Sequence, residues 1–260
     1  FLGEVTRLGH GLQRSYMFAL LQELSGSDVA DAPRLLLGIE EPELFQHPPQ
    51  AQHLADVLAH LSAQNAQVFA CTHSPYFVSG KGFEDVRLVR ATVPPATRST
   101  SISYKQLSDY LVGRLGEDRY RKPEGVRAKI HQALQPVLRE MFFAPKLALV
   151  EGLEDVAYIT TALNLDGKWD AWRSAGCHLV PVNGKSELVQ PLAIAQLLSI
   201  PVFVMFDADS DEEDAGRRGR HKADNVRLLK LLGLDPSQAF PSSPILTDNH
   251  VIWVENLGNM

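Results

Sequence analysis

Cysteine is scarce in this sequence, and its scarcity excludes two kinds of architecture. The 260 residues contain 2 cysteines, Cys71 and Cys177, which stand far apart and do not have the spacing of metal ligands. Neither a disulfide framework nor a zinc site is supported, and a reducing compartment such as the cytoplasm fits best.

Long apolar runs are missing as well. No stretch approaches the roughly 18 residues that a membrane-spanning helix needs, and the N-terminus carries no charged-then-apolar signal segment. We therefore expect a soluble cytoplasmic protein without a membrane partner. Because the sequence begins with Phe1 rather than methionine, we also expect it to be a fragment of a longer protein.

A surplus of positive charge is absent too, because the formal net charge is -6. This balance argues against a protein that coats nucleic acid over its whole surface, but an enzyme with an acidic centre can still hold DNA through local basic patches. The basic run at 217–222 is one candidate for such a patch. A surface loop that balances its acidic neighbours is an equally good interpretation of the same run.

What the sequence does have is enough apolar residues for two buried cores. A hydrophobic content of 45% over 260 residues is typical of two ordinary domains. The order of the expected elements indicates an α/β protein. It divides into an N-terminal part at 1–104, a helical connector at 105–144 and a C-terminal domain at 145–260.

The N-terminal part predicts a β-α-β unit. A buried-strand pattern spans 34–39, an amphipathic helix spans 49–65, and a second strand spans 67–71. A right-handed parallel crossover is the default for such a unit. Glu40 and His73, which follow the two strands, would therefore emerge at the same edge of one sheet.

A helix is expected ahead of this unit, because Leu12, Tyr16, Leu20 and Leu24 recur every four residues and give one apolar stripe. Beyond the unit, the remaining pattern predicts a helical connector and then strands alternating with helices, which is typical of a parallel sheet. The expected strands are 86–89, 101–104, 147–150, 178–182, 202–206 and 251–254, and the expected helices of the C-terminal domain are 154–164, 188–198 and 225–232.

A pair of carboxylates, Glu40 and Glu41, follows the first apolar strand. Phosphoryl transfer from ATP needs one carboxylate to hold Mg²⁺ and another to orient or deprotonate the attacking water. His73, just past the neighbouring strand, is placed to sense the γ-phosphate. The alternative is an exposed acidic loop after a core strand, together with an ordinary histidine.

Over roughly residues 5–90 the chain resembles the latter half of an ABC-type ATPase. Gly9-His-Gly11-Leu-Gln13-Arg14 stands in the place of the signature loop, Glu40-Glu41 at the Walker B position and His73 at the switch position. The resemblance implies ATP and Mg²⁺ as ligands of the intact protein. It also implies a homodimer in which the signature loop acts on ATP held by the second subunit.

The phosphate cradle G-x-x-x-x-G-K-[ST] of such ATPases is absent. The segment Asn183-Gly184-Lys185-Ser186 imitates its tail, but the required earlier glycine would fall at Leu179. We interpret the segment as a glycine turn that opens a helix. This chain alone is therefore not expected to hydrolyse ATP.

Two acidic pairs end strand-like runs in the C-terminal domain. Glu151 ends one run, and Asp155 follows one helical turn later, so that the two can face the same point. Asp207 and Asp209 end another strand, and Glu255 follows the last one. Such carboxylates would form an oxygen cage for Mg²⁺ or Mn²⁺ at the carboxyl edge of a parallel sheet, where bound ions activate water for attack on a phosphate.

Each acidic pair also has an ordinary interpretation. The run from Asp207 to Asp214 is compatible with a solvated loop, and Glu151 with a residue that favours a helix N-terminus. The occurrence of both pairs, each directly after a strand, favours the metal site. Residues 211–214 themselves are assigned to solvent.

At these acidic residues the chain resembles the Toprim domain of topoisomerases, primases and certain nucleases, with Glu151-Gly as its glutamate motif and Asp207-Ala-Asp209 as its D-x-D motif. An ABC ATPase followed by a Toprim domain resembles the overcoming-lysogenisation-defect (OLD) family of nucleases. The resemblance implies two-metal DNA cleavage, with Glu151 and Asp207 on one ion and Asp155, Asp209 and Glu255 shared or on the second. A later lysine often assists in such nucleases, and none is identified in this sequence.

Two function hypotheses follow. The first is a metal-dependent DNA endonuclease or nickase coupled to an ABC-type ATPase. The second is a non-catalytic ATPase clamp of the RecF or SMC type, whose second domain only binds DNA or partners. A topoisomerase or primase is less well supported, because nothing marks Tyr158 or Tyr110 as a nucleophile.

Overall fold

The computed structural model describes residue 7 and residues 9–25, 35–64, 66–92 and 96–255. The chain divides into two compact units, Phe1–Val78 and Ser79–Met260. The second unit thus contains the segments on both sides of residue 104 and of residue 144, where the sequence places domain boundaries. Among the described helices, none is both long enough and apolar enough to cross a bilayer.

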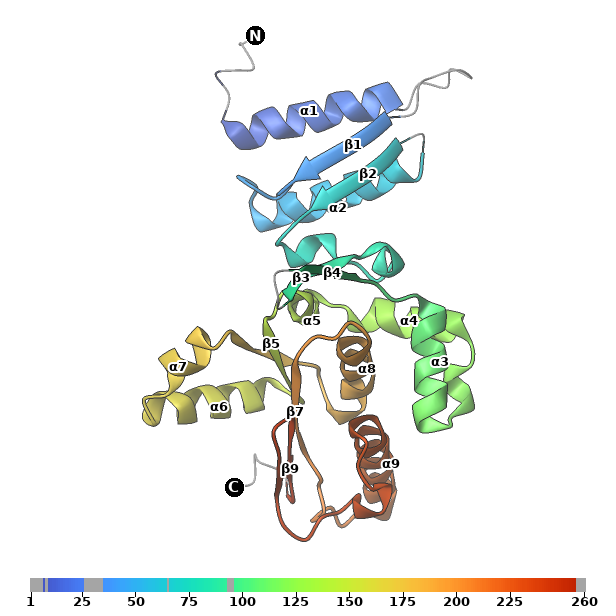
Figure 1. The fold of residues 1–260 in the computed structure, drawn as a ribbon, viewed down its shortest axis with the longest axis vertical. Helices are drawn as coiled ribbons and strands as arrows, with labels where there is room; N and C mark the ends of the chain where they lie inside the picture. The colour runs from blue at the N-terminus through green and yellow to red at the C-terminus, as the bar shows by residue number, and fades with distance from the viewer. Residues whose placement is uncertain (1–6, 8, 26–34, 65, 93–95, 256–260) are drawn as a thin grey trace. The chain divides into compact units, whose positions relative to one another are not determined.

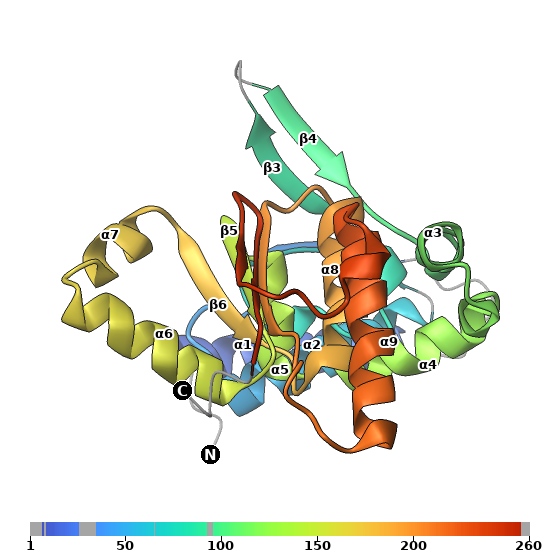
Figure 2. The ribbon, with the colours of Figure 1, turned by 90° about the horizontal axis from the view of Figure 1, so that it is seen from below.

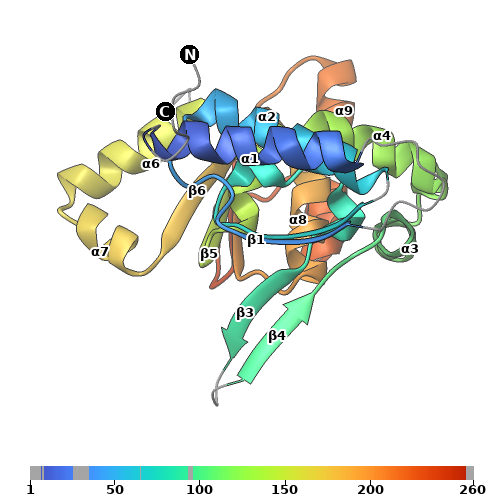
Figure 3. The ribbon, with the colours of Figure 1, turned by 90° about the horizontal axis from the view of Figure 1, so that it is seen from above.

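The first unit contains the predicted β-α-β arrangement. Strand β1 (Leu35–Glu40) pairs in parallel with β2 (Ala66–Cys71), and α2 (Pro48–Ser62) connects them (Figure 1). Helices α1 (His10–Ser25) and α2 cover one face of this pair (Figure 3). Glu40 lies opposite Cys71 in the register, so the residues that follow both strands emerge at one edge, as predicted.

The core of the first unit lies between the strands and the two helices. Phe18 of α1 is buried and packs with Leu54, Leu58 and Leu61 of α2. The apolar stripe of α1 that the sequence shows does not form this contact, since Leu12, Tyr16 and Leu20 are 47% to 57% exposed. The side chain of Leu24 lies outside the described part of the chain.

The second unit is built on a five-stranded sheet of strand order β6-β5-β7-β9-β8. The four strands from β6 to β9 run parallel, and β8 pairs antiparallel with β9. The parallel sheet predicted for this part is therefore confirmed. Its strands are β5 (Lys146–Val150), β6 (Cys177–Pro181), β7 (Val202–Asp207), β8 (Ile245–Leu246) and β9 (His250–Trp253).

Helices cover both faces of this sheet (Figure 2). Helices α8 (Val189–Leu197) and α9 (Ala215–Leu232) lie on one side, and α6 (Leu153–Leu165) and α7 (Trp169–Ser174) lie on the other. The strand β5 is buried from Leu147 to Val150 because it lies inside the sheet, between β6 and β7.

Helix α9 begins at Ala215, ten residues before the start predicted at Asn225. The Asp214 side chain caps it by accepting a hydrogen bond of 2.7 Å from the Arg217 N–H. The basic run 217–222 is therefore helical rather than a surface loop. Charged residues mask the apolar periodicity of this first half, which is why the pattern alone placed the start too late.

The connector packs within the second unit. Side chains bind it to α8 and α9. The hydroxyl of Tyr110 on its first helix donates to Gln196 Oε1 at 2.8 Å, and Arg227 Nε donates at 2.7 Å to Oε1 of Glu117, which follows that helix. Its elements are α3 (Tyr104–Leu115), α4 (Pro123–Ala133) and α5 (Pro136–Arg139), and Pro123 begins a helix there.

A hairpin precedes the connector. Strands β3 (Leu88–Thr92) and β4 (Ala96–Thr100) pair antiparallel, a few residues away from the predicted strands at 86–89 and 101–104. The second predicted strand, 101–104, is wrong, because β4 ends at Thr100 and a capping box of Ser103 and Gln106 starts α3 there. Short 3-10 turns complete the fold at Pro75–Phe77, Phe83–Asp85, Asp118–Tyr120, Glu140–Phe142, Lys185–Leu188 (η6) and Pro236–Gln238.

Candidate metal and nucleotide sites

The ends of two adjacent parallel strands bring Glu151 and Asp207 together. Glu151 follows β5, Asp207 ends β7, and the two strands pair directly. The Glu151 carboxylate accepts a hydrogen bond of 2.8 Å from the Asp207 N–H. The predicted meeting of these two acids at the carboxyl edge of the sheet is thus present in the structure.

The loop after β7 carries Asp209 and continues the pairing with the end of β9 and the residue after it. The Ala208 N–H donates to the carbonyl of Trp253 at 2.7 Å, and the Ser210 N–H donates to that of Val254 at 3.0 Å. Asp209 itself has a φ of +50°, a left-handed conformation that Asp adopts more readily than most residues. These contacts fix Asp209 beside Asp207.

Asp209 is bound by two cationic or potentially cationic side chains. Lys185 Nζ donates to Asp209 Oδ2, and His221 Nδ1 lies 2.8 Å from the same oxygen. The distance between Lys185 Nζ and His221 Nδ1 is 3.5 Å. The Lys185 side chain is 4% exposed, so this ion pair lies inside the protein rather than on its surface.

Burial sets the electrostatics of this cluster. It raises the pKa of Glu151 to about 8, because a charged carboxylate loses its hydration there, and the neighbouring charges of Asp207 and Asp209 add to the rise. The Lys185 ammonium and the Asp207 N–H oppose it. A cation bound at this point would relieve the cost of the buried negative charges.

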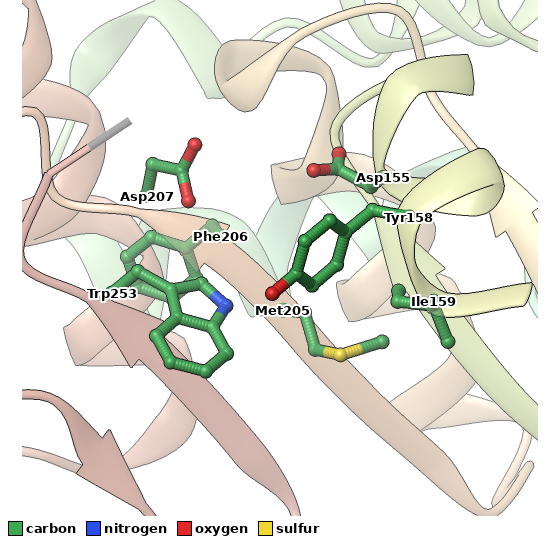
Figure 4. Close-up of a pocket in the computed structure, with 7 residues that line it drawn as sticks. All are labelled: Asp155, Tyr158, Ile159, Met205, Phe206, Asp207 and Trp253. Atoms are coloured by element: carbon green, nitrogen blue, oxygen red, sulfur yellow. The ribbon is translucent and has the colours of Figure 1, made fainter. Parts of the chain in front are cut away.

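Asp155 has a structural role at the start of α6 as well as a place near Asp207. Its Oδ2 accepts a hydrogen bond of 2.8 Å from the Gly152 N–H, which caps the start of α6. Burial raises its pKa. Asp155 also lines a pocket together with Asp207, Tyr158 and Trp253 (Figure 4). Asp155 therefore lines the same pocket as Asp207 and also caps the start of α6.

Glu255 is exposed and follows the end of β9. In the described part of the chain, no three His, Cys, Asp or Glu side chains are placed as a ready-made metal site. The donors nonetheless fit a hard divalent cation in their chemistry, since Glu151, Asp207 and Asp209 supply only carboxylate oxygens at one sheet edge. A bound ion would have to draw them closer.

Three residues of this site were not found from the sequence. Lys185 stands in the segment interpreted as a glycine turn, and that turn does form, leading into η6. His221 lies within the basic run, and Asn225 is a buried polar residue of α9. The only signal for Lys185 was its place directly after a glycine in a segment that imitates a phosphate loop.

The first unit gathers the predicted nucleotide-site residues at the edge where β1 and β2 end. The exposed Glu40 ends β1 and the half-buried Glu41 follows it, and the exposed His73 lies just after β2. Glu43 links the two loops, because its carboxylate accepts hydrogen bonds from Thr72 Oγ1 at 2.8 Å and from the His73 N–H at 2.9 Å.

The signature-like loop is joined to the same region. Gly9 precedes α1, and its carbonyl accepts the N–H of Gln13 at 3.1 Å, so Gln13 lies in the first turn of the helix. The carbonyl of Gly11 accepts from Gln46 Nε2 at 3.2 Å. A Cβ at Gly11 would come within 2.8 Å of the Phe45 carbonyl oxygen, so the close packing of this loop requires glycine.

Comparison with known protein families agrees with these two halves. Residues 2–78 match the model of the AAA ATPase domain, and residues 142–209 match that of the overcoming lysogenization defect protein-like TOPRIM domain. The chain is thus an α/β protein that joins part of an ATPase domain to a TOPRIM domain.

Individual relatives extend this result. The chain is similar to the Old nuclease of Escherichia phage P2 (25% identity over 79% of this chain and 34% of the relative) and to the OLD nuclease of Thermus scotoductus (28% over 66% and 30%). It is also similar to Endonuclease GajA of Bacillus cereus (21% over 69% and 27%). These matches confirm the predicted resemblance to the OLD family, and the chain spans about a third of the length of these relatives.

Proposed function

We propose that the second unit is the catalytic domain of a metal-dependent DNA endonuclease or nickase. The observation that carries this proposal is the meeting of Glu151, Asp207 and Asp209 at the carboxyl edge of a parallel sheet. The TOPRIM match and the nuclease names of the relatives support it.

In this proposal Glu151 and Asp207 hold a divalent cation, Mg²⁺ or Mn²⁺. The cation supplies a water of lowered pKa and neutralises charge on the scissile phosphate. Water adds to phosphorus as one ester P–O bond breaks, which leaves a phosphate end and a hydroxyl end. Asp155 faces the same pocket as Asp207 and would contact the ion or its water, and the exposed Glu255 would join only after moving toward them.

DNA would be held by the basic face of α9. Arg217, Arg220 and Lys222 are exposed on its first turns, directly after the D-x-D loop. Arg218 has a structural role instead. Its guanidinium donates to the carbonyls of Ser210 and Glu212 and lies 4.4 Å from the centroid of the Phe240 ring. Phosphate contacts by exposed basic side chains position a duplex without reading its sequence.

For the first unit we propose a half-site for ATP in the longer protein. Glu40 would hold Mg²⁺, Glu41 would orient the attacking water, and His73 would contact the γ-phosphate. Gly9, Gly11 and Gln13 would face ATP held by a second subunit in a homodimer. The joining of both loops through Glu43 supports this arrangement.

The deciding experiment is plasmid nicking by the full-length protein in Mn²⁺. Asp207→Ala is expected to lower the rate by roughly a hundredfold or more while DNA binding persists. Asp211→Ala, at an exposed position in the following loop, is the matched control and should leave the rate unchanged. Absence of cleavage by the intact protein with every divalent metal tried would instead favour the non-catalytic clamp.

A further inference from the structure

Helix α6 covers its face of the sheet incompletely. All of its residues are described, and each of them is at least partly exposed. Tyr158 is 54% exposed and Leu165 is 83% exposed. Met205 of β7 and Trp253 of β9, which lie on directly paired strands, are also only partly buried. Apolar surface therefore stays accessible to solvent between this helix and the sheet.

This surface forms a pocket beside the acidic edge. Its apolar and aromatic lining comes from α6 and from two neighbouring strands, and it consists of Tyr158, Ile159, Met205, Phe206 and Trp253. Asp155 and Asp207 complete the lining. In the view of Figure 4 both carboxylates lie above the two aromatic side chains, and the Tyr158 hydroxyl points toward the indole of Trp253. The pocket thus joins two aromatic side chains to two of the proposed catalytic acids.

The backbone ties each aromatic side chain to one of these acids. Asp207 and Trp253 are register partners on β7 and β9, so strand pairing places them side by side. The Ala208 N–H, directly after Asp207, donates to the Trp253 carbonyl at 2.7 Å. Tyr158 follows Asp155 by three residues of α6, and this spacing brings both to one face of the helix. The arrangement is therefore set by regular secondary structure.

The chemistry of the lining identifies the ligand that it suits. A flat aromatic group gains from contact with aromatic rings and apolar walls, whereas the Asp155 and Asp207 carboxylates would repel an anion that no cation bridges to them. A protein segment seated in the pocket would bury both carboxylates and block access to the metal ion. DNA bound for cleavage carries a flat group, the base, on either side of the phosphate that the ion contacts. A nucleobase meets all these conditions.

We propose that the pocket between Tyr158 and Trp253 binds a nucleobase next to the scissile phosphate, once that base has left the stack of the duplex. The inference rests on the proposed function, because it assumes that Asp207 positions the phosphate through a bound ion. Aromatic side chains stack on every kind of base, so the pocket does not read sequence. An unpaired base enters it most readily, because no base pair has to be broken. The favoured substrate class is DNA with an unpaired nucleotide at the point of cleavage.

The test compares oligonucleotide duplexes cleaved by the full-length protein in Mn²⁺. One duplex is fully paired, and the others carry a single unpaired adenine on either side of the position where the paired duplex is nicked. We expect kcat/KM to be about tenfold higher for a duplex with the unpaired base. Tyr158→Leu, which keeps an apolar side chain without the ring, should lower this ratio about tenfold. Tyr158→Phe, which keeps the ring, should retain it.

A second measurement does not depend on cleavage. A fluorescent adenine analogue at the unpaired position should be quenched by stacking when the 260-residue chain binds the duplex in EDTA, and Tyr158→Leu should weaken this quenching. Leu165→Ala is the matched control for both measurements, since Leu165 is 83% exposed on the same helix, about two turns beyond Tyr158. Circular dichroism checks folding, and Tyr158→Met replaces a misfolded Tyr158→Leu.

The outcomes separate the inference from the proposed function. Equal kcat/KM for paired and unpaired duplexes in the wild type, or a ratio that Tyr158→Leu leaves unchanged, would overturn the inference. If Tyr158→Leu destabilises the full-length protein and keeps the ratio, another part of that protein covers the pocket, and the inference is wrong. Absence of cleavage of every duplex with every divalent metal would overturn the proposed function, whereas the quenching still tests the pocket.

Discussion

The side-chain amide of Asn225 holds the carbonyl of Ala208, the residue that separates Asp207 from Asp209. Its Nδ2 donates to Ala208 at 2.8 Å and, equally, to the carbonyl of Ala239 at 2.8 Å, and Asn225 is 1% exposed. One buried polar residue of α9 thus fixes the backbone between the two acids.

Asn225→Ala should destabilise the second unit. The change leaves two buried carbonyls without their donor, and such losses cost about 1–3 kcal/mol each, so we expect a loss of roughly 2–6 kcal/mol in the free energy of unfolding. Urea denaturation measures it. Asn164→Ala, at an exposed position of α6 where the amide donates only within the helix, should cost less than about 1 kcal/mol. Equal losses in both variants would contradict the role given to Asn225.

Glu151→Gln should stabilise the metal-free protein at alkaline pH. Because burial raises the pKa of Glu151 from its ordinary 4.5 to about 8, the folded state binds more protons than the unfolded state between these values. The free energy of unfolding of the wild type should therefore fall as pH rises from about 4.5 through about 8. The glutamine keeps the acceptor for the Asp207 N–H and has no charge to bury.

The measurement is urea unfolding in EDTA at a series of pH values. Above pH 8 the variant should be more stable than the wild type by up to about 5 kcal/mol, and the difference should vanish near pH 4.5. Glu154→Gln, at an exposed position of α6, is the control. A wild-type curve that does not fall through this window would contradict the burial of a charge at Glu151.

His250 gives the opposite dependence on pH. Burial lowers its pKa, its Nδ1 lies 2.9 Å from Thr247 Oγ1, and its buried Nε2 has no hydrogen-bond partner in the described structure. Protonation would place an unpaired N–H and a charge in the interior. The unfolded state therefore binds more protons below about pH 6.5, and stability should be lost as the pH falls from there.

His250→Gln should weaken this loss on the acid side. The comparison is the slope of the unfolding free energy between about pH 6.5 and 5, read from urea melts of the second unit within the intact chain. His53→Gln, at an exposed position of α2, should leave the slope as it is in the wild type. If the slope survives in His250→Gln, another group is responsible for it.

The sequence predicted the parts of the site that lie at strand ends. An apolar run followed directly by a carboxylate locates Glu151 and Asp207, because the strand fixes both the place and the direction of the residue after it. Lys185 and His221 lie in a turn and on a helix, and only the tertiary packing brings them to Asp209. No spacing in the sequence encodes that meeting.

The same limit applies to the fold. The β-α-β crossover of the first unit and the parallel sheet of the second followed from alternating apolar runs. The first half of α9 was missed because many of its residues are charged. The buried side of α1 could not be predicted either, because it is set by the packing of Phe18 against the apolar residues of α2. Apolar periodicity in the sequence shows which residues of a helix are apolar. It does not show which other element each face of the helix packs against, because that depends on the whole folded chain.

Glu43 connects the loops after β1 and β2, and its removal should loosen the predicted nucleotide site. Its two oxygens accept from Thr72 Oγ1 and from the His73 N–H. Hydrogen bonds to a charged group contribute about 1.5–3 kcal/mol each when buried, and less at this half-exposed position. We expect Glu43→Ala to destabilise the first unit by about 1–2 kcal/mol and to lower ATP hydrolysis by the full-length protein, because His73 loses its backbone anchor.

Two measurements separate these effects. Hydrogen exchange at the amide of His73 in the 260-residue chain should become faster in Glu43→Ala, and ATP turnover by the full-length protein should fall while ATP binding changes little. Glu23→Ala, at an exposed position of α1, is the matched control for both. Unchanged exchange at His73 would show that Glu43 does not hold this loop, whatever the effect on turnover, since an amide that keeps its protection has kept its hydrogen bond.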